Sequence, residues 1–163
     1  MTTAQYLSWF DEVLAPTGPM FRLVPADKLI WRPTKGSFTL GQLIDHIPKS
    51  LEFNAKILRG DEWPLKSLRE ILVVNRRQGS STVEEGLVML ASAKRTFRDA
   101  VGIVGDERFQ HGEMDTPQRG KMPVWRFAAF VLEHHIHHLM ELHISLKSLG
   151  LKVNTATLYN PSA

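Results

Sequence analysis

The chain of 163 residues has 43% hydrophobic and 23% charged residues, a net charge of +3 and no cysteine, which suits one globular domain spanning residues 1–163. Without cysteine there can be no disulfide, thiolate metal ligand or cysteine nucleophile, and without a run of roughly 18 apolar residues we expect no membrane span. The basic residues are scattered instead of gathered on one aromatic-rich face, which disfavours a nucleic-acid partner, and no export signal opens the chain, so we expect a cytoplasmic protein.

The N-terminal quarter contains apolar residues at helical spacing, interrupted by prolines and glycines. Residues 4–14 predict a helix that Pro16 and the Gly18-Pro19 pair kink or interrupt. A short apolar piece follows over residues 20–24. Residues 28–37 are rich in helix breakers and are predicted to be a connection.

The second predicted helix begins at a capping box and ends before Gly60. In Thr39-Leu40-Gly41-Gln42, the Thr side chain can cap the amide of the Gln, whose side chain reaches back. Pro48 should bend this helix without ending it, because the periodic pattern resumes in register. One face of the helix is apolar and comprises Leu40, Leu43, Ile44, Ile47, Leu51 and Leu58, and the opposite face comprises Asp45, Lys49, Glu52 and Lys56.

The second half of the chain predicts two further long helices. After a linker with Trp63-Pro64 and a short helix over residues 67–76, Ser81-Thr82-Val83-Glu84 starts a helix that runs to about Val101. Its predicted core positions are Val83, Leu87, Leu90, Phe97 and Val101. Residues 105–123 predict a long loop, and the last helix runs from near Pro123 to Gly150. The sequence therefore predicts an all-α four-helix bundle with a long loop before the last helix.

Five of the seven histidines fall within EHHIHHLMELH, residues 133–143. His134 and His138 are four residues apart, so they project from successive turns on one face of the last helix with Cβ atoms about 5–6 Å apart. His46 lies on the corresponding edge of the second helix. These three imidazoles could bind one metal ion and leave coordination positions open. Glu141 lies one turn beyond His138.

Other interpretations of the histidines remain open at this point. A histidine at the edge of an apolar face can be a hydrogen-bonded packing residue, and a four-residue spacing can arise by chance in a histidine-rich stretch. His135 is predicted to point deeper into the apolar face and His137 toward solvent. His143 points nearly opposite His134, as a packing or interface residue, and no spacing recruits His111.

Two familiar metal motifs do not fit the sequence. The zinc-protease motif requires a glutamate directly after its first histidine, where this chain has His135. Di-iron bundles require carboxylates and Glu-x-x-His pairs from several helices, and residues 40–59 contain no such pair.

The chain resembles the DinB-like superfamily of bacterial bundle proteins, which includes YfiT-type candidate hydrolases and thiol transferases. The resemblance spans nearly the whole chain, and its motifs are VPAD at residues 24–27, LIWRP at 29–33, FTLGQLIDHI at 38–47, and HHIHH at 134–138 through Gly150. It implies a four-helix bundle that binds a divalent metal, usually zinc or nickel, through His46, His134 and His138. Many members are homodimers, and relatives include bacillithiol and mycothiol transferases and a thiol-dependent isomerase.

The sequence departs from the commonest family pattern after the last histidine. Many relatives have His-Arg-Gly-Gln there, whereas this chain has His138-Leu139-Met140-Glu141. Glu141 could replace the Gln as an acceptor for an imidazole N–H or as a proton acceptor, or it could belong to the solvated polar face.

The leading functional hypothesis is a divalent-metal-dependent hydrolase or low-molecular-weight-thiol transferase that acts on a small molecule or thiol. Any thiol must be external, because the chain has no cysteine. Zinc or nickel is expected, and manganese or iron also suits three imidazoles. Expected substrate contacts are the 105–123 loop with Arg119, Trp31-Arg32, Trp63 and Trp125. The alternatives are a non-catalytic, stress-related metal- or ligand-binding protein and a purely structural bundle.

Overall fold

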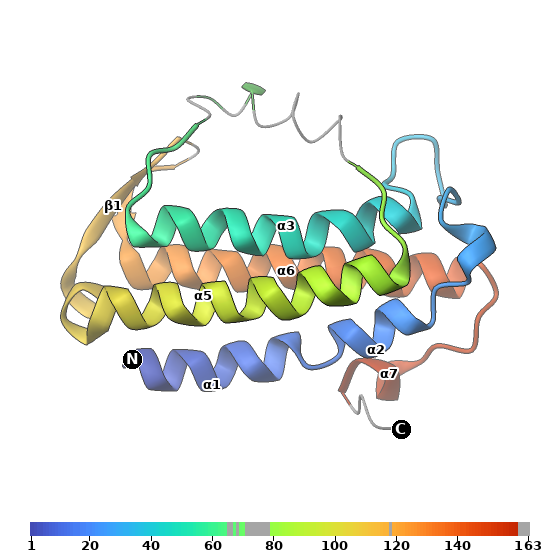
Figure 1. The fold of residues 1–163 in the computed structure, drawn as a ribbon, viewed down its shortest axis with the longest axis horizontal. Helices are drawn as coiled ribbons and strands as arrows, with labels where there is room; N and C mark the ends of the chain where they lie inside the picture. Colours follow the sequence, from blue (N-terminus) through green and yellow to red (C-terminus); the bar gives the residue numbers. More distant parts are fainter. Residues whose placement is uncertain (65–66, 68, 71–78, 118, 160–163) are drawn as a thin grey trace.

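Helices pack side by side in the computed structural model, which describes residues 1–64, 67, 69–70, 79–117 and 119–159 (Figure 1). The predicted all-α bundle is confirmed. The helices are α1 (Thr3–Leu14), α2 (Thr17–Arg22), α3 (Leu40–Arg59), α5 (Val83–His111), α6 (Val124–Ser148) and α7 (Thr155–Tyr159), with a 3-10 turn at Ala26–Lys28. Helix α3 packs against both α5 and α6, and α1 packs against the same two helices.

The N-terminal helices begin earlier than the sequence pattern suggested. Helix α2 starts at Thr17, not at residue 20, because Pro19 falls in its first turn, where a missing N–H breaks no helical hydrogen bond. Pro16 separates α2 from α1, as predicted. The tail after α6 ends in the short helix α7.

Helix α3 has the predicted start and end. Thr39 and Gln42 form the reciprocal capping box, and Gly60 ends the helix in the left-handed conformation with φ 113°. The helix continues through Pro48. The assignment of Asp45 to the solvated face was wrong: its side chain is buried and accepts hydrogen bonds from Ser81 Oγ at 2.8 Å and Lys49 Nζ at 2.9 Å.

The start of α5 is shifted by one residue from the prediction. Thr82 is the N-cap and forms the capping box with Glu85, whereas Ser81 donates to the buried carboxylate of Asp45. The tertiary bond to Asp45 therefore uses the hydroxyl that sequence spacing alone had assigned to the cap. This bond links the start of α5 to the middle of α3.

The prediction of a long loop over residues 105–123 was wrong. Helix α5 has non-helical backbone angles at Gly105, with φ 68°, and then continues to His111, because Phe109 is fully buried in the core. A hairpin follows, in which β1 (Glu113–Thr116) pairs antiparallel with β2 (Gly120–Pro123). Short strands with only one or two apolar residues carry too weak an alternation to be distinguished from a loop.

Two further sequence predictions concern a short helix before α5 and the absence of a membrane-spanning segment. The expected helix at 67–76 falls mostly outside the described residues, although Ser67 Oγ accepts a hydrogen bond from the Glu70 amide at 3.3 Å. In the described ranges, no helix combines the length and hydropathy that a bilayer crossing requires.

Two apolar clusters fill the bundle. The first contains the aromatic side chains of Tyr6, Phe10, Phe97, Phe109 and Phe127. The second is mainly aliphatic and includes Met20, Leu43, Ile44, Leu142 and Leu146. Along α6, His134 and His138 fall between Leu132, in the first cluster, and Leu139, in the second. The histidines thus form a polar interruption between the two clusters.

Substitution of Gly86 tests the close approach of α3 and α5. A Cβ at Gly86 would overlap Cγ2 of Ile44 and lie 3.3 Å from ring carbons of Phe21. We expect Gly86→Ala to lower the free energy of unfolding by about 1–3 kcal/mol, measured by urea denaturation, because the packed core must shift.

The matched control is Gly102→Ala in the same helix, where an added Cβ meets nothing within 4 Å. That change should stabilise the chain by about 0.5–1 kcal/mol, because alanine loses less backbone entropy in a helix. Equal effects at the two positions would contradict the described helix packing.

Candidate metal centre

Three imidazole rings from α3 and α6 converge at the boundary between the apolar clusters. Nε2 of His138 lies 3.1 Å from Nε2 of His46 and 3.1 Å from Nε2 of His134. The ligand nitrogens of all three residues lie within 4.8 Å of one another, and the three side chains form the one group in the described ranges with the composition and spacing of a metal site. The structure therefore brings together the three residues that the sequence singled out.

Aromatic side chains form two walls of this centre. The Phe38 ring stacks on His46 at 5.2 Å between centroids and meets the edge of His138 at 5.6 Å. Phe130 stacks on His134 at 6.2 Å. Neither phenylalanine was predicted as part of the site. Phe130 precedes His134 by one helical turn, a spacing that could have identified it, whereas Phe38 comes from the segment before α3 and carries no such signal.

The proton count within the cluster argues against a simple hydrogen-bonded packing role. Nδ1 of His138 lies 3.1 Å from Oε2 of Glu141 and donates its hydrogen, because an ionised carboxylate only accepts. In the neutral ring, Nε2 of His138 then has a single lone pair, yet two imidazole nitrogens lie 3.1 Å from it. One lone pair cannot accept two full hydrogen bonds, whereas three lone pairs can share one cation.

The spacing of these nitrogens fits a transition-metal ion. Metal–nitrogen bonds of about 2.0–2.1 Å in a tetrahedral site separate neighbouring ligand nitrogens by about 3.3 Å. Two of the three separations are 3.1 Å, close to that value. The third is at most 4.8 Å, so that closing it takes an adjustment on the order of 1 Å by rotation of the side chains. An all-nitrogen donor set suits zinc, nickel, copper or iron better than magnesium or calcium.

Burial keeps His134, one of the three candidate ligands, in the form that can bind metal. Desolvation, followed by the neighbouring His138 and His46, lowers the pKa of His134 to about 3. A metal ion requires the unprotonated nitrogen, so His134 is already a ligand at neutral pH without losing a proton. The side chain of Glu141, which contacts His138, is about one-third exposed and lies at the edge of the centre.

Glu141 contacts the far side of a ligand, away from the point where the three rings meet. Its carboxylate accepts from Nδ1 of His138, and Nε2 of the same ring points toward His46 and His134. This contact fixes the tautomer and the orientation of the imidazole. This is the geometry of a residue that orients an imidazole. A catalytic role for Glu141 stays a prediction.

The other histidines lie outside the centre. His135 is buried, as expected, and its Nε2 lies 2.8 Å from Thr17 Oγ1; desolvation lowers its pKa to about 3. His137 is exposed and His143 is buried. His111 is exposed on the last turn of α5, in the range 105–123 that was predicted to be a loop. The Thr17 contact joins α2 to α6 and could not be read from sequence spacing.

The residues expected around the mouth of the site have different environments. Trp63 donates its indole N–H to the Asp115 carbonyl at 2.9 Å and packs against Phe53 and Phe127, so it ties the end of α3 to the hairpin. Trp31 packs against the aliphatic cluster, and Trp125 is 41% exposed. The guanidinium carbon of Arg119 lies 5.4 Å from the centroid of the Phe130 ring. Arg119 is thus placed beside an aromatic wall of the centre.

Comparison with known proteins identifies the family. A model of the DinB superfamily matches residues 10–142, which include all three histidines. The chain belongs to the DinB superfamily. Its structure is similar to that of a DinB-like protein, YjoA, from Bacillus subtilis, with a TM-score of 0.68 and 17% identity over 91% of this chain and 94% of that one. At this identity the likeness concerns the fold alone. No curated protein sequence matches the chain.

The buried histidines predict a loss of stability in acid when a chelator keeps metal away. His134 and His135 have folded-state pKa values of about 3, below the ordinary 6.5. Between these values the unfolded chain binds protons that the folded chain does not, so the free energy of unfolding falls as pH falls, by about 1.4 kcal/mol per pH unit for each group.

Urea denaturation across this range measures the slope directly. His135→Gln should reduce the slope near about pH 5 by roughly one group's share, whereas the exposed His137→Gln should leave it unchanged. An identical pH profile in the parent chain and in His135→Gln would show that His135 is not held neutral by the fold.

Proposed function

We propose that this DinB-superfamily chain is a divalent-metal-dependent enzyme of the hydrolase or low-molecular-weight-thiol transferase kind. The observation that supports this most strongly is the convergence of the Nε2 atoms of His46, His134 and His138. Three protein ligands leave coordination positions for a water or a substrate. A divalent cation bound by three neutral imidazoles lowers the pKa of a water or thiol bound to it and polarises a bound carbonyl.

The chain's own residues would then position and shield the reacting groups. Glu141 holds the Nδ1 hydrogen of His138, which directs the opposite lone pair into the centre. Phe38 and Phe130 cover two sides of the ligand rings and limit access of water. Zinc or nickel fits this donor set, with manganese or iron as alternatives. The transferred thiol would be external, since the chain has no cysteine.

A non-catalytic metal-binding role is the second candidate. It is favoured by the position of Glu141, whose carboxylate contacts the back of His138 and does not face the point where the three rings meet. A general base must come within about 3 Å of the proton that it removes. Turnover of thiol, ester or amide substrates by the metal-loaded chain favours the enzyme, and stoichiometric metal without turnover across such a panel favours the binding protein.

Metal analysis tests the common basis of both candidates. Protein purified without a histidine tag should contain close to one divalent ion per chain, measured by inductively coupled plasma mass spectrometry. His46→Ala should abolish this content, because it removes the only ligand from α3, and the exposed His137→Ala should retain it. Equal metal content in the two variants would rule out the assigned ligands.

The same measurement, extended to a metal titration, separates the two roles of Glu141. If it orients His138, Glu141→Gln should weaken metal affinity by about tenfold or more. If it acts only as a base, affinity should be unchanged while turnover falls.

We also propose that two copies associate through an apolar stripe on α6. Ile136, Met140 and Ile144 recur every four residues, and Trp125 lies three turns earlier on the same face; all four are between 39% and 53% exposed. Several large exposed apolar side chains on one helix face are typical of an interface.

Light scattering coupled to size-exclusion chromatography tests this pairing. The parent chain should elute with the mass of a dimer, and Ile144→Glu should shift it to a monomer, because a charge would be buried between the two copies. Val88→Glu, on exposed apolar surface of α5, should remain a dimer. A parent chain with the mass of a monomer would contradict the proposal.

A further inference from the structure

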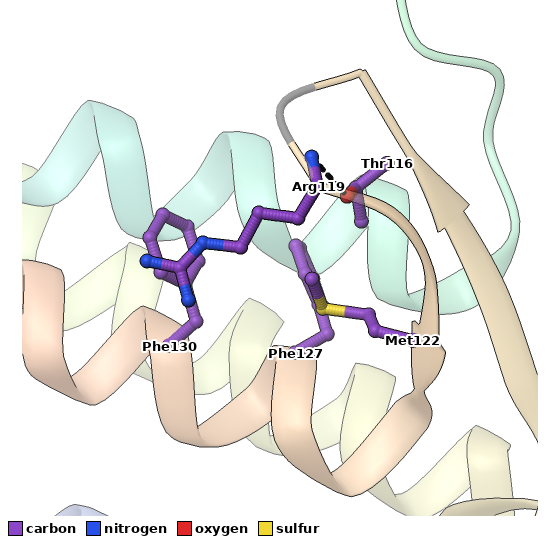
Figure 2. A pocket seen from close by; sticks show the side chains of 5 residues that line it. All are labelled: Thr116, Arg119, Met122, Phe127 and Phe130. Carbon is purple, nitrogen blue, oxygen red and sulfur yellow. Dashed lines mark hydrogen bonds between the residues drawn. The ribbon is translucent and has the colours of Figure 1, made fainter.

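Arg119 extends from the hairpin turn across the surface of α6. Figure 2 shows its side chain reaching past Phe127 to the ring of Phe130, where the guanidinium carbon lies 5.4 Å from the ring centroid. A guanidinium over an aromatic face is attracted by the partial negative charge of the ring face, and its N–H groups at the edge stay available for hydrogen bonds.

The hairpin turn holds the base of this side chain. The backbone N–H of Arg119 donates to Thr116 Oγ1 at 3.2 Å, and the same hydroxyl donates to the carbonyl of Gly120 at 3.0 Å. Gly120 has φ 67°, a conformation that glycine adopts without strain. Side-chain bonds of this kind define a tight turn, so the direction in which Arg119 leaves the hairpin is set by local structure.

The charge of Arg119 is not neutralised within the part of the chain that the structure describes. The other cation of the hairpin, Lys121, forms an ion pair with Glu113 at 3.7 Å, and Arg126 on α6 pairs with Glu133. No carboxylate in the described ranges forms an ion pair with Arg119, and its guanidinium packs on the Phe130 ring. The guanidinium is thus a cation with free donors beside the centre.

Phe130 connects this cation to the three histidines. Its ring contacts the guanidinium of Arg119 and also stacks on the His134 imidazole. One aromatic side chain therefore separates the cation from a metal ligand. The hollow beneath Arg119, lined by Thr116, Met122 and Phe127, has a volume of about 10 Å³, which admits little more than one water molecule. A ligand must therefore lie outside this hollow, along the guanidinium edge.

We propose that Arg119 is a specificity-determining residue that binds the carboxylate of a small anionic substrate whose reacting group lies at the three-histidine centre. The inference rests on the proposed function. A guanidinium matches a carboxylate with two parallel hydrogen bonds, and one unpaired cation balances one negative charge. A substrate of this class carries its carboxylate on a chain long enough to pass Phe130.

Thiols that differ only in their far end provide the test. The cobalt(II)-loaded protein is titrated with mercaptohexanoate and with mercaptohexanol, and binding of sulfur to the metal is followed by the thiolate-to-cobalt absorption band. We expect the carboxylate thiol to bind about tenfold more tightly than the alcohol, since it gains a charge-assisted contact. Arg119→Gln should abolish this preference, and Arg119→Lys should retain part of it.

Lys121→Gln is the matched control, because it removes a hairpin cation that is already paired with Glu113. It should leave the preference intact. If both thiols bind the metal equally in the parent chain, or if Lys121→Gln and Arg119→Gln have the same effect, the role of Arg119 is wrong and the proposed function stands. If cobalt does not bind, or no thiol perturbs its spectrum, the proposed use of the centre fails, and the role of Arg119 fails with it.

Discussion

The convergence of three imidazole nitrogens between α3 and α6 constrains the rest of this structure. Crowding imidazole nitrogens at a partly buried seam costs free energy, because His138 Nε2 has two close nitrogen neighbours for a single lone pair. The cost is offset when one cation accepts all three lone pairs. The surroundings are consistent with that role: burial keeps His134 neutral, Glu141 sets the tautomer of His138, and aromatic rings pack against the ligand set.

The position of His46 depends on how α3 is held against its neighbours. The buried carboxylate of Asp45, directly before His46, accepts hydrogen bonds from Ser81 and Lys49, so the ligand-bearing turn is tied to the start of α5. Gly86 lacks a side chain, so α5 can approach Ile44 of α3 closely. Because a helix is rigid over a few turns, these two contacts on one side of α3 help set where His46 points on the other side.

The hairpin between α5 and α6 orients a side chain toward the histidine centre. Its strands are short, but a turn bonded through Thr116 directs Arg119 along α6 toward the aromatic wall of the centre. Trp63 joins the same hairpin to the end of α3 through the carbonyl of Asp115. The candidate metal ligands therefore come from the helices, whereas the residue proposed to recognise substrate comes from the segment between them, as is common where a rigid scaffold carries variable loops.

The sequence by itself determined the helices and the pair of histidines on α6. These patterns depend on residues that are one or two helical turns apart. Local hydrogen bonding and side-chain direction are therefore enough to predict the capping boxes, the apolar faces and the shared face of His134 and His138. His46 could be selected only as an edge position and the Glu141 contact only as one of several alternatives, and the burial of Asp45 and the hairpin could not be derived. Those features were decided by the tertiary structure, because they depend on which faces of separate helices meet, and packing of the whole core determines that.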